Sequence, residues 1–145
     1  MTKLDTTGLF TLQGENKKIV PYEFSHSKMI LCGVPGAFTY GCTYRHLPGF
    51  ADHLEELKEK GIEKVAFMSV NDAFVMDAWN QNHGADDIDA VSDPLAVFSK
   101  RMKEDVDWGE TFGMRCNRFA YLIENGELTK KFNDPFIEGV LEELW

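Results

Sequence analysis

Cysteine is scarce in this chain, and its spacing excludes several kinds of site. The 145 residues contain three cysteines, Cys32, Cys42 and Cys116, and no two of them form a Cys-x-x-Cys pair. An odd number without regular spacing excludes a disulfide framework, and the missing pair excludes a dithiol redox centre and a zinc ribbon. The pattern fits a reducing compartment and leaves room for one reactive thiol.

Long apolar runs and positive charge are also lacking. No stretch is long enough to cross a bilayer, and the N-terminus has neither the positive start nor the apolar segment of a signal peptide. Fifteen basic against twenty-four acidic residues give a formal charge of −9, which repels nucleic acid and anionic membranes. We therefore expect a soluble cytoplasmic protein with no nucleic-acid or membrane partner.

What the chain does have is an ordinary globular composition, with 43% apolar and 27% charged residues. This length suits one domain with a hydrophobic core and is too short for two. There is no internal repeat, no low-complexity segment and no linker rich in proline, glycine and serine. We therefore expect a single domain over residues 1–145.

Strands are predicted from apolar runs bounded by turn residues. Two continuous apolar runs are typical of strands buried on both faces, and Asn125-Gly126 between two further runs is a strong hairpin signal. A polar turn over residues 13–16 indicates another hairpin near the N-terminus. The predicted strands are Leu9 to Leu12, Lys17 to Val20, Met29 to Val34, Val65 to Val70, Ala90 to Ser92, Arg118 to Ile123 and Glu127 to Phe132.

Helices are predicted where apolar residues recur at helical spacing. The helix predicted to end at Trp79 is expected to turn Phe74, Val75, Ala78 and Trp79 toward the core. Strands that alternate with helices, followed by a hairpin and a helix, predict an α/β thioredoxin-like sandwich with a mixed central sheet. The predicted helices are Cys42 to Lys60 with a kink at Pro48, a cap at Asn71 or Asp72 through Trp79, Leu95 to Lys103 after Asp93-Pro94, and Ile137 to Leu144.

Cys42 is the candidate reactive thiol because of its position. It follows a turn-rich loop, Pro35 to Gly41, that leaves a buried strand, and it lies where a helix begins. Unpaired backbone N–H groups and the positive end of the helix dipole favour the thiolate there, and the thiolate is the attacking form. Buried cysteines are usually inert, so position alone leaves both interpretations open. Thr39 is equally open to a helix-cap role and to a hydroxyl directed at the sulfur.

Three segments resemble one family, and the resemblance covers the chain from about Met29 to Phe132. The stretch from Val34 to Phe50 contains Pro-x-x-x-Thr-x-x-Cys, the peroxiredoxin signature. Its Pro-Gly-Ala-Phe-Thr and His-Leu-Pro-Gly-Phe parts resemble type-5 members, which include bacterial forms fused to a glutaredoxin domain. Two later segments, residues 69–79 and 112–120, are similar to further parts of the same family in the same order.

The resemblance implies a site of four residues that needs no cofactor and no metal. Cys42 matches the cysteine that attacks peroxide, and Pro35 matches the proline that shields its sulfur from water. Thr39 would orient the two peroxide oxygens. Arg118 would keep Cys42 ionised and stabilise charge that develops on the departing oxygen. Arg115 lies in the same segment, and a rim or interface role suits it as well as a catalytic one.

His46, four residues beyond Cys42, raises the possibility of a Cys–His acid–base pair. A Cβ at that spacing points along the helix and away from a sulfur at its start, which favours a structural or interface role for His46. A metal site built from Cys42, His46 and Cys32 would lack a fourth ligand.

Two features depart from the family pattern. Tyr40-Gly41 stands where a Pro-Thr pair is usual, and we expect Gly41 to add flexibility to the loop and Tyr40 to shape access. The loop after the last hairpin, Asn133 to Glu138, has no cysteine, whereas two-cysteine members carry their resolving cysteine there. Cys32 is interpreted as a buried strand residue. Cys116 is interpreted as a bystander, and a disulfide between Cys116 and Cys42 is the alternative. The resemblance therefore implies a one-cysteine cycle that ends with an external thiol.

The predicted function is a thiol-dependent peroxidase that reduces hydrogen peroxide and alkyl hydroperoxides through a sulfenic acid at Cys42. Glutathione with glutaredoxin is the expected reductant, and thioredoxin is the second choice. A homodimer is expected, with Phe38, Phe112 and Phe119 either at its contact or in the core. The alternatives are a redox sensor or chaperone-like protein switched by Cys42 oxidation, and a thiol–disulfide oxidoreductase, for which the spacing supplies no second redox cysteine.

Overall fold

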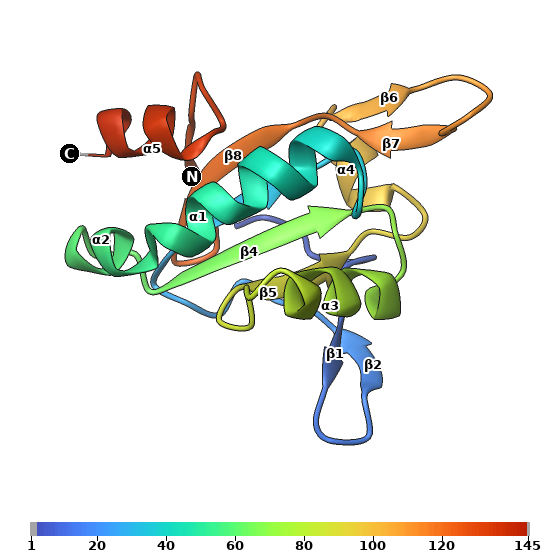
Figure 1. Ribbon diagram of the computed structural model, residues 1–145, viewed down its shortest axis with the longest axis horizontal. Helices are drawn as coiled ribbons and strands as arrows, with labels where there is room; N and C mark the ends of the chain where they lie inside the picture. Colours follow the sequence, from blue (N-terminus) through green and yellow to red (C-terminus); the bar gives the residue numbers. More distant parts are fainter. Residues whose placement is uncertain (1–2, 145) are drawn as a thin grey trace.

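Seven strands form one sheet at the centre of the molecule (Figure 1), in a computed structural model that describes residues 3–144. All seven predicted strands are present, and their ends differ from the predicted ones by no more than one residue. The expected domain ends, Met1 and Trp145, lie outside the described residues. The strand bounds are β1 Phe10–Gln13, β2 Lys18–Pro21, β3 Lys28–Gly33, β4 Lys64–Ser69, β5 Asp89–Ser92, β8 Phe119–Glu124 and β9 Glu127–Lys131.

The sheet is mixed, as the sequence predicts, and its order is β2-β1-β5-β4-β3-β8-β9. Strands β3, β4 and β5 are parallel, whereas β8 is antiparallel to β3 and places Phe119 opposite Gly33. The carboxyl ends of the three parallel strands and the start of β8 therefore lie at the same end of the sheet. This end carries the site described below.

Two hydrophobic cores lie on the two faces of the sheet, because side chains alternate along each strand. Ile30 and Cys32 of β3 belong to one core, and Met29 and Leu31 belong to the other. The first core is covered by α1 (Leu47–Asp52), α2 (Leu54–Glu59), α3 (Ala73–Asn82) and α5 (Ile137–Glu143). The second is covered by α4 (Val97–Arg101), so helices flank the sheet on both faces. Figure 1 shows α1 and α3 in front of β4. The predicted thioredoxin-like α/β fold is confirmed.

The helix predicted from Cys42 to Lys60 is divided into three parts, which corrects the prediction of one kinked helix. A π-helical turn, η1 (Cys42–His46), precedes α1, and its last bond runs from the Leu47 N–H to the Cys42 carbonyl. Pro48 has no N–H to continue an α-helical ladder, so the irregular turn falls just before it. A second break falls at His53, where the ring Nδ1 lies 2.7 Å from the Gly49 carbonyl oxygen and competes with the backbone bond.

Helix α3 begins where Asp72 accepts a hydrogen bond from the Val75 N–H, as one of the two predicted caps requires. It extends to Asn82, three residues beyond the predicted end. The predicted buried side of α3 is wrong in part, because Phe74 and Ala78 are exposed. The side chains of α3 that are buried are Ala73, Met76, Trp79 and Asn80.

Helix α4 starts two residues later than predicted, which corrects the expectation that Pro94 occupies its first turn. Ala96 adopts a left-handed conformation with φ of 55°, so the helix cannot begin before Val97. The cap position is therefore Ala96 and not Asp93, although the buried Asp93 carboxylate accepts hydrogen bonds from the backbone N–H groups of Phe98 and Ser99 in the first turn.

A short hairpin was not predicted at all. Strands β6 (Asp105–Asp107) and β7 (Met114–Cys116) form a separate two-stranded sheet that projects from the body of the molecule (Figure 1). In residues 3–144, no helix is both long and apolar enough to cross a membrane.

Candidate active site

Cys42 is held at the end of the sheet where the parallel strands finish. Strand β3 ends at Gly33, and the loop that follows leads to Gly41, which precedes the first residue of η1. The Cys42 side chain is buried, with 1% of its surface exposed. Cys42 is the first residue of η1, and the backbone N–H that follows it, that of Thr43, donates to the Thr39 carbonyl over 2.9 Å.

Arg118 lies directly beside this sulfur. It immediately precedes β8, so the pairing of Phe119 with Gly33 brings it next to the loop that leaves β3. Its Nη2 donates to Cys42 Sγ over 3.2 Å, and its Nη1 lies 2.9 Å from His46 Nδ1. Two residues separated by 76 positions are thus joined by sheet register, and the guanidinium places a positive charge at the Cys42 sulfur.

A small cavity opens at the sulfur and brings the four expected residues together. It has a volume of about 160 Å³ and is lined by Pro35, Thr39, Cys42, Trp108, Phe112 and Arg118. Trp108 and Phe112 belong to the segment between β6 and β7, and sequence analysis missed Trp108 entirely. No spacing signal could have found it, because the hairpin itself was not predicted.

Thr39 lies in the cavity wall and makes no cap bond to η1. Gly41 precedes this turn and has no side chain, and the Thr39 hydroxyl donates to the Gly36 carbonyl over 2.6 Å. Because its proton is used in this way, the Thr39 oxygen presents only lone pairs to the cavity. It can therefore accept a hydrogen bond from a hydroxyl or hydroperoxide group.

Gly41 has a steric role in the structure, in addition to the flexibility expected of it. Its φ of −66° and ψ of −34° are ordinary helical values, so its conformation does not require glycine. A Cβ at this position would lie 3.2 Å from Arg118 Nη2. Gly41 therefore provides the space in which the guanidinium reaches the sulfur.

The loop before Cys42 is fixed by the side chains of Asn71 and Arg115, whose partners the sequence did not indicate. The Asn71 carboxamide oxygen accepts hydrogen bonds from the Ala37 N–H and from the Ser69 hydroxyl at the end of β4. Arg115 donates from Nη1 to the Pro35 carbonyl and from Nε to the Phe112 carbonyl. Arg115 thus joins the loop to the β6–β7 hairpin and lies outside the cavity lining, as a rim role requires.

His46 is completely buried, and the structure gives it a more specific place than a general structural role. Its Nε2 lies 2.8 Å from the Pro135 carbonyl oxygen, and its Nδ1 faces Arg118 rather than Cys42. Burial, together with the nearby charges of Arg118 and Arg45, lowers the pKa of His46 to about 3. The ring is therefore neutral at physiological pH, and its contact is with the arginine rather than the thiol.

The other two thiols are buried and free. Burial raises the pKa of Cys32 well above its ordinary value. Burial, with the nearby negative charges of Asp93 and Cys42, also raises the pKa of Cys116. The Cys116 thiol donates to the Val34 carbonyl over 3.1 Å. Both groups are therefore protonated and unreactive in this conformation, because only a thiolate attacks.

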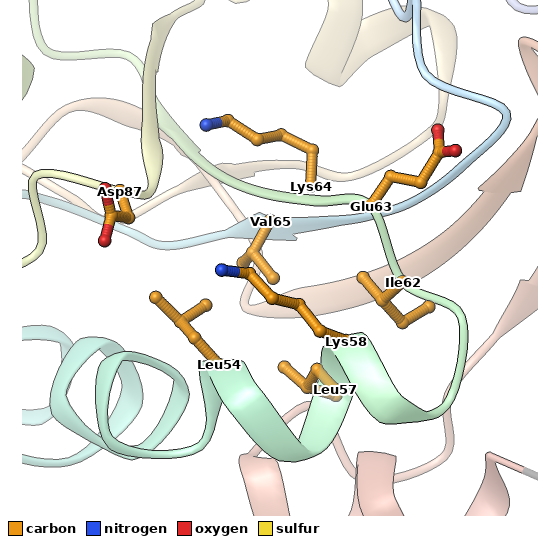
Figure 2. A pocket seen from close by; sticks show the side chains of 8 residues that line it. All are labelled: Leu54, Leu57, Lys58, Ile62, Glu63, Lys64, Val65 and Asp87. Carbon is orange, nitrogen blue, oxygen red and sulfur yellow. The ribbon is translucent and has the colours of Figure 1, made fainter.

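A separate hollow of about 190 Å³ lies between α2 and β4 (Figure 2). Its floor is apolar, and the ammonium groups of Lys58 and Lys64 and the carboxylates of Glu63 and Asp87 surround it. It contains no cysteine or histidine, so it carries no candidate redox chemistry. Within the part of the chain that the structure describes, no three His, Cys, Asp or Glu side chains are placed to hold a metal ion.

Comparisons with known proteins agree on one family. The family model described as Redoxin matches residues 4–144. Peroxiredoxin Pen c 3 of Penicillium citrinum is 41% identical over 108 residues, which are 73% of this chain and 62% of that protein. The chain spans less than two thirds of the curated relatives it matches, at 66%, 62%, 64% and 60% of their lengths.

Solved structures are similar over almost the whole chain. Reduced Prx3 of Vibrio vulnificus in complex with hydrogen peroxide has a TM-score of 0.91 and 33% identity, covering 99% of this chain and 97% of that one. Peroxiredoxin 5 of Alvinella pompejana has a TM-score of 0.81 and 26% identity, covering 96% and 91%. The chain therefore belongs to the Redoxin family. Within that family it is a peroxiredoxin.

Proposed function

We propose that this protein is a thiol-dependent peroxidase in which Cys42 attacks hydroperoxides. The observation that carries the proposal is the 3.2 Å contact between Arg118 Nη2 and Cys42 Sγ, in a cavity that Pro35 and Thr39 also line. A thiolate that lacks a neighbouring cation and hydrogen-bonding groups reacts slowly with peroxide. A preorganised cation lowers the barrier because it meets charge as it develops on the leaving oxygen.

The reaction proposed for the site has one oxidation step. The Cys42 thiolate attacks one peroxide oxygen, an S–O bond forms and the O–O bond breaks. The second oxygen leaves with the electron pair, close to the Arg118 guanidinium, and takes up a proton to become water or an alcohol. Thr39 accepts a hydrogen bond from the peroxide hydroxyl and so aligns the O–O bond with the sulfur. Cys42 is left as a sulfenic acid.

The proposed substrates are hydrogen peroxide and alkyl hydroperoxides. The cavity beside the sulfur admits a small molecule, and the Trp108 and Phe112 side chains give one of its walls an apolar, aromatic character. An alkyl group on the peroxide would pack against this wall while the peroxide oxygens face Thr39 and Arg118.

We infer that an external thiol completes the cycle. The buried Cys32 and Cys116 thiols are protonated, and the loop at residues 133–138 contains no cysteine. One glutathione would displace water from the Cys42 sulfenic acid to form a mixed disulfide, which glutaredoxin and a second thiol would reduce; thioredoxin is the second choice. The resemblance of the Cys42 segment to type-5 members, which include forms fused to a glutaredoxin domain, supports this assignment.

The test is rapid mixing of fully reduced protein with one equivalent of hydrogen peroxide, followed by intact mass spectrometry. The proposal expects oxidation far faster than that of free cysteine, abolished in Cys42→Ser, with the mass of one added oxygen. Loss of two hydrogens instead would show an internal disulfide and reject the one-cysteine cycle. Cys116→Ser is the matched control and should turn over with glutathione and glutaredoxin at the wild-type rate. Oxidation of Cys42 no faster than an ordinary thiol would reject the peroxidase.

A homodimer is part of the proposal, and it connects to the redox-sensor alternative. Five exposed aromatic side chains lie on the Cys42 loop, on η1 and on the β6–β7 hairpin: Phe38, Tyr40, Tyr44, Trp108 and Phe112. A second copy would cover this surface, and oxidation of Cys42 beneath it would then change the assembly state. Phe119 is not part of it, because its ring is buried and stacks on Tyr121. A reducing compartment such as the cytoplasm would keep all three thiols free.

A further inference from the structure

The segment between β9 and α5 lies against Arg118 and its neighbour His46. Pro135 and Phe136, in this segment, contact His46, and Phe136 also faces the guanidinium. The segment is far from Cys42 in sequence and does not line the cavity. Its position nevertheless connects it to the sulfur through two successive hydrogen-bonded partners.

The hydrogen bonds of His46 have one possible direction. Arg118 can only donate, so His46 Nδ1 must accept from Nη1 over 2.9 Å. The Pro135 carbonyl can only accept, so His46 Nε2 must carry the proton and donate over 2.8 Å. The Pro135 carbonyl therefore selects the ring tautomer whose lone pair faces Arg118. A flipped ring or the other tautomer would present an N–H to the guanidinium and repel it.

The surroundings of His46 keep this arrangement over a wide pH range. The ring is packed among the aromatic rings of Phe50, Phe67 and Phe136, and the charged groups that face it are Arg118 and Arg45. Burial and these two cations oppose protonation, so the acceptor on Nδ1 persists at physiological pH.

Phe136 restrains the guanidinium through a different contact. The centre of its ring lies 5.0 Å from that of His46 and 5.2 Å from Arg118 Cζ. Arg45 Cζ lies 3.7 Å from the same ring centre. A ring in contact with two guanidinium groups attracts both through its electron-rich face. Phe136 therefore limits the positions that the Arg118 side chain can take.

The segment itself is firmly held. The Asn133 N–H and carboxamide both donate to the Glu143 carboxylate of α5, and the Phe136 N–H donates to Asp134. Asp134 packs closely on α5: a Cβ added at Gly139 would lie 2.2 Å from the Cβ of Asp134. Position 139 is therefore restricted to glycine, and the segment has one conformation against α5.

We propose that the segment Asn133–Phe136 positions the Arg118 guanidinium, with His46 and Phe136 as positioning residues for the attack of Cys42 on peroxide. Pro135 orients the His46 ring, His46 fixes Nη1, and the planar guanidinium then directs Nη2 at the Cys42 sulfur. None of these residues touches the substrate. The inference rests on the proposed peroxidase function. It assigns a role in that function to a segment that does not line the cavity.

The test compares His46→Leu, Phe136→Ala and Glu138→Ala in two assays across a pH series. One assay measures the rate of Cys42 oxidation by hydrogen peroxide in stopped flow. The other measures alkylation of Cys42 by iodoacetamide, which needs the thiolate but has no peroxide oxygen to stabilise. We expect His46→Leu and Phe136→Ala to lower the peroxide rate about tenfold or more and to move the midpoint of the alkylation profile to higher pH. Glu138 is exposed on α5 and should change neither.

Conservative variants keep the test decisive. His46→Asn retains an acceptor near the position of Nδ1, so it should recover most of the peroxide rate that His46→Leu loses. Phe136→Leu replaces Phe136→Ala if circular dichroism shows that the alanine variant is unfolded. If the wild type is oxidised fast and the folded His46→Leu and Phe136 variants are oxidised equally fast, this inference is overturned. The proposed peroxidase function would then still stand. If His46→Asn and His46→Leu lose the same fraction of the peroxide rate and the alkylation midpoint does not move, His46 contributes only to core packing.

Discussion

At the scale of single residues, the site depends on the guanidinium of Arg118. Three neighbouring residues restrict where this group can lie. Cys42 and His46 each take one of its terminal nitrogens, and Gly41 leaves the space through which Nη2 passes. A planar guanidinium that is hydrogen-bonded through both terminal nitrogens keeps one orientation, which a lysine ammonium could not do. The reactivity of Cys42 should therefore respond to small changes around the arginine.

Gly41→Ala tests this sensitivity. The added Cβ would lie 3.2 Å from Arg118 Nη2, so the guanidinium must move by a few tenths of an ångström away from the sulfur. We expect the rate of Cys42 oxidation by hydrogen peroxide to fall about tenfold, less than the roughly 10²-fold to 10³-fold that follows loss of a whole oxyanion donor. Stopped-flow kinetics measures it, and Tyr40→Ala, which alters the neighbouring exposed side chain, is the control. A Gly41→Ala rate equal to wild type would contradict the spatial argument.

His46 should make stability depend on pH. Its pKa is about 3 in the folded protein and about 6.5 when exposed, so between these values the unfolded chain binds more protons. The stability is therefore complete above pH 6.5 and is lost as the pH falls toward 3, by about 2 kcal/mol between pH 7 and pH 5. Urea unfolding at the two pH values measures this. In His46→Gln the titration is absent, and the difference should shrink by that amount; an unchanged difference would refute the assignment.

Four of the six residues that line the cavity were assigned to the site from the sequence only through resemblance. Spacing alone placed Cys42 at a helix start and left Thr39 undecided between a cap and a site residue. His46 could not be assigned, because its partner Arg118 is 72 positions away and the contact depends on sheet register. Trp108 carried no signal, since an exposed aromatic residue in an unpredicted hairpin resembles any other surface residue.

At the scale of elements, the register between β3 and β8 decides where the site forms. Strand β3 delivers the loop that leads to Cys42, and β8 begins directly after Arg118. Pairing of Gly33 with Phe119 aligns these two points, and the Phe119 ring occupies the space that a side chain at position 33 would need. The same two residues therefore fix both the packing of the sheet and the placement of the arginine.

Gly33→Ala should disrupt this junction. A Cβ at position 33 would lie 2.0 Å from the Phe119 ring, which is buried and stacked on Tyr121. We expect the free energy of unfolding to fall by about 1–3 kcal/mol, the usual cost of overpacking a core. Chemical denaturation measures it, with Lys18→Ala on the exposed surface of β2 as a control that stays within about 0.5 kcal/mol of wild type. A stable Gly33→Ala protein would show that β8 can shift without cost.

Element prediction succeeded where burial on both faces dominates and failed where local bonds compete. The buried strands β3 and β4 are continuous apolar runs, so their ends were predicted within one residue. Strands β6 and β7 have three residues each, too few for their polar–apolar alternation to reveal them. The break at His53 and the late start of α4 arise from a ring-to-backbone bond and a left-handed alanine, neither of which a hydrophobic pattern records.

At the scale of the whole molecule, the aromatic surface around Cys42 contrasts with an acidic chain. A formal charge of −9 opposes association, so a dimer needs a contact with little charge and much apolar area. Tyr40 and Tyr44 have 82% and 69% of their surface exposed, and their ring centres lie 5.2 Å apart. Such exposure on both sides of a buried reactive cysteine marks the surface through which copies would meet.

Tyr44→Glu should therefore weaken self-association. A carboxylate in the aromatic surface would have to be desolvated in the contact, and both copies would carry it. Sedimentation velocity at increasing concentration should show wild-type dimer and a Tyr44→Glu species shifted toward monomer. Ile19→Glu is the matched control, because Ile19 is equally apolar and exposed but lies on the β1–β2 hairpin, which projects elsewhere (Figure 1). Identical behaviour of all three proteins would remove the aromatic surface as the interface.

The β6–β7 hairpin has a consequence for engineering. Its two strands pair with each other and not with the seven-stranded sheet, so the segment up to Arg115 can be exchanged without breaking a backbone bond of that sheet, whereas Cys116 is buried in the second core and has to stay. It nevertheless supplies Trp108 and Phe112 to the cavity, and Arg115 fastens it to the Pro35 carbonyl. The thiol with its guanidinium and the aromatic wall of the cavity therefore come from separate parts of the fold. A library of grafted hairpins that retain Arg115 would redesign substrate selectivity while the thiol and its guanidinium stay in place.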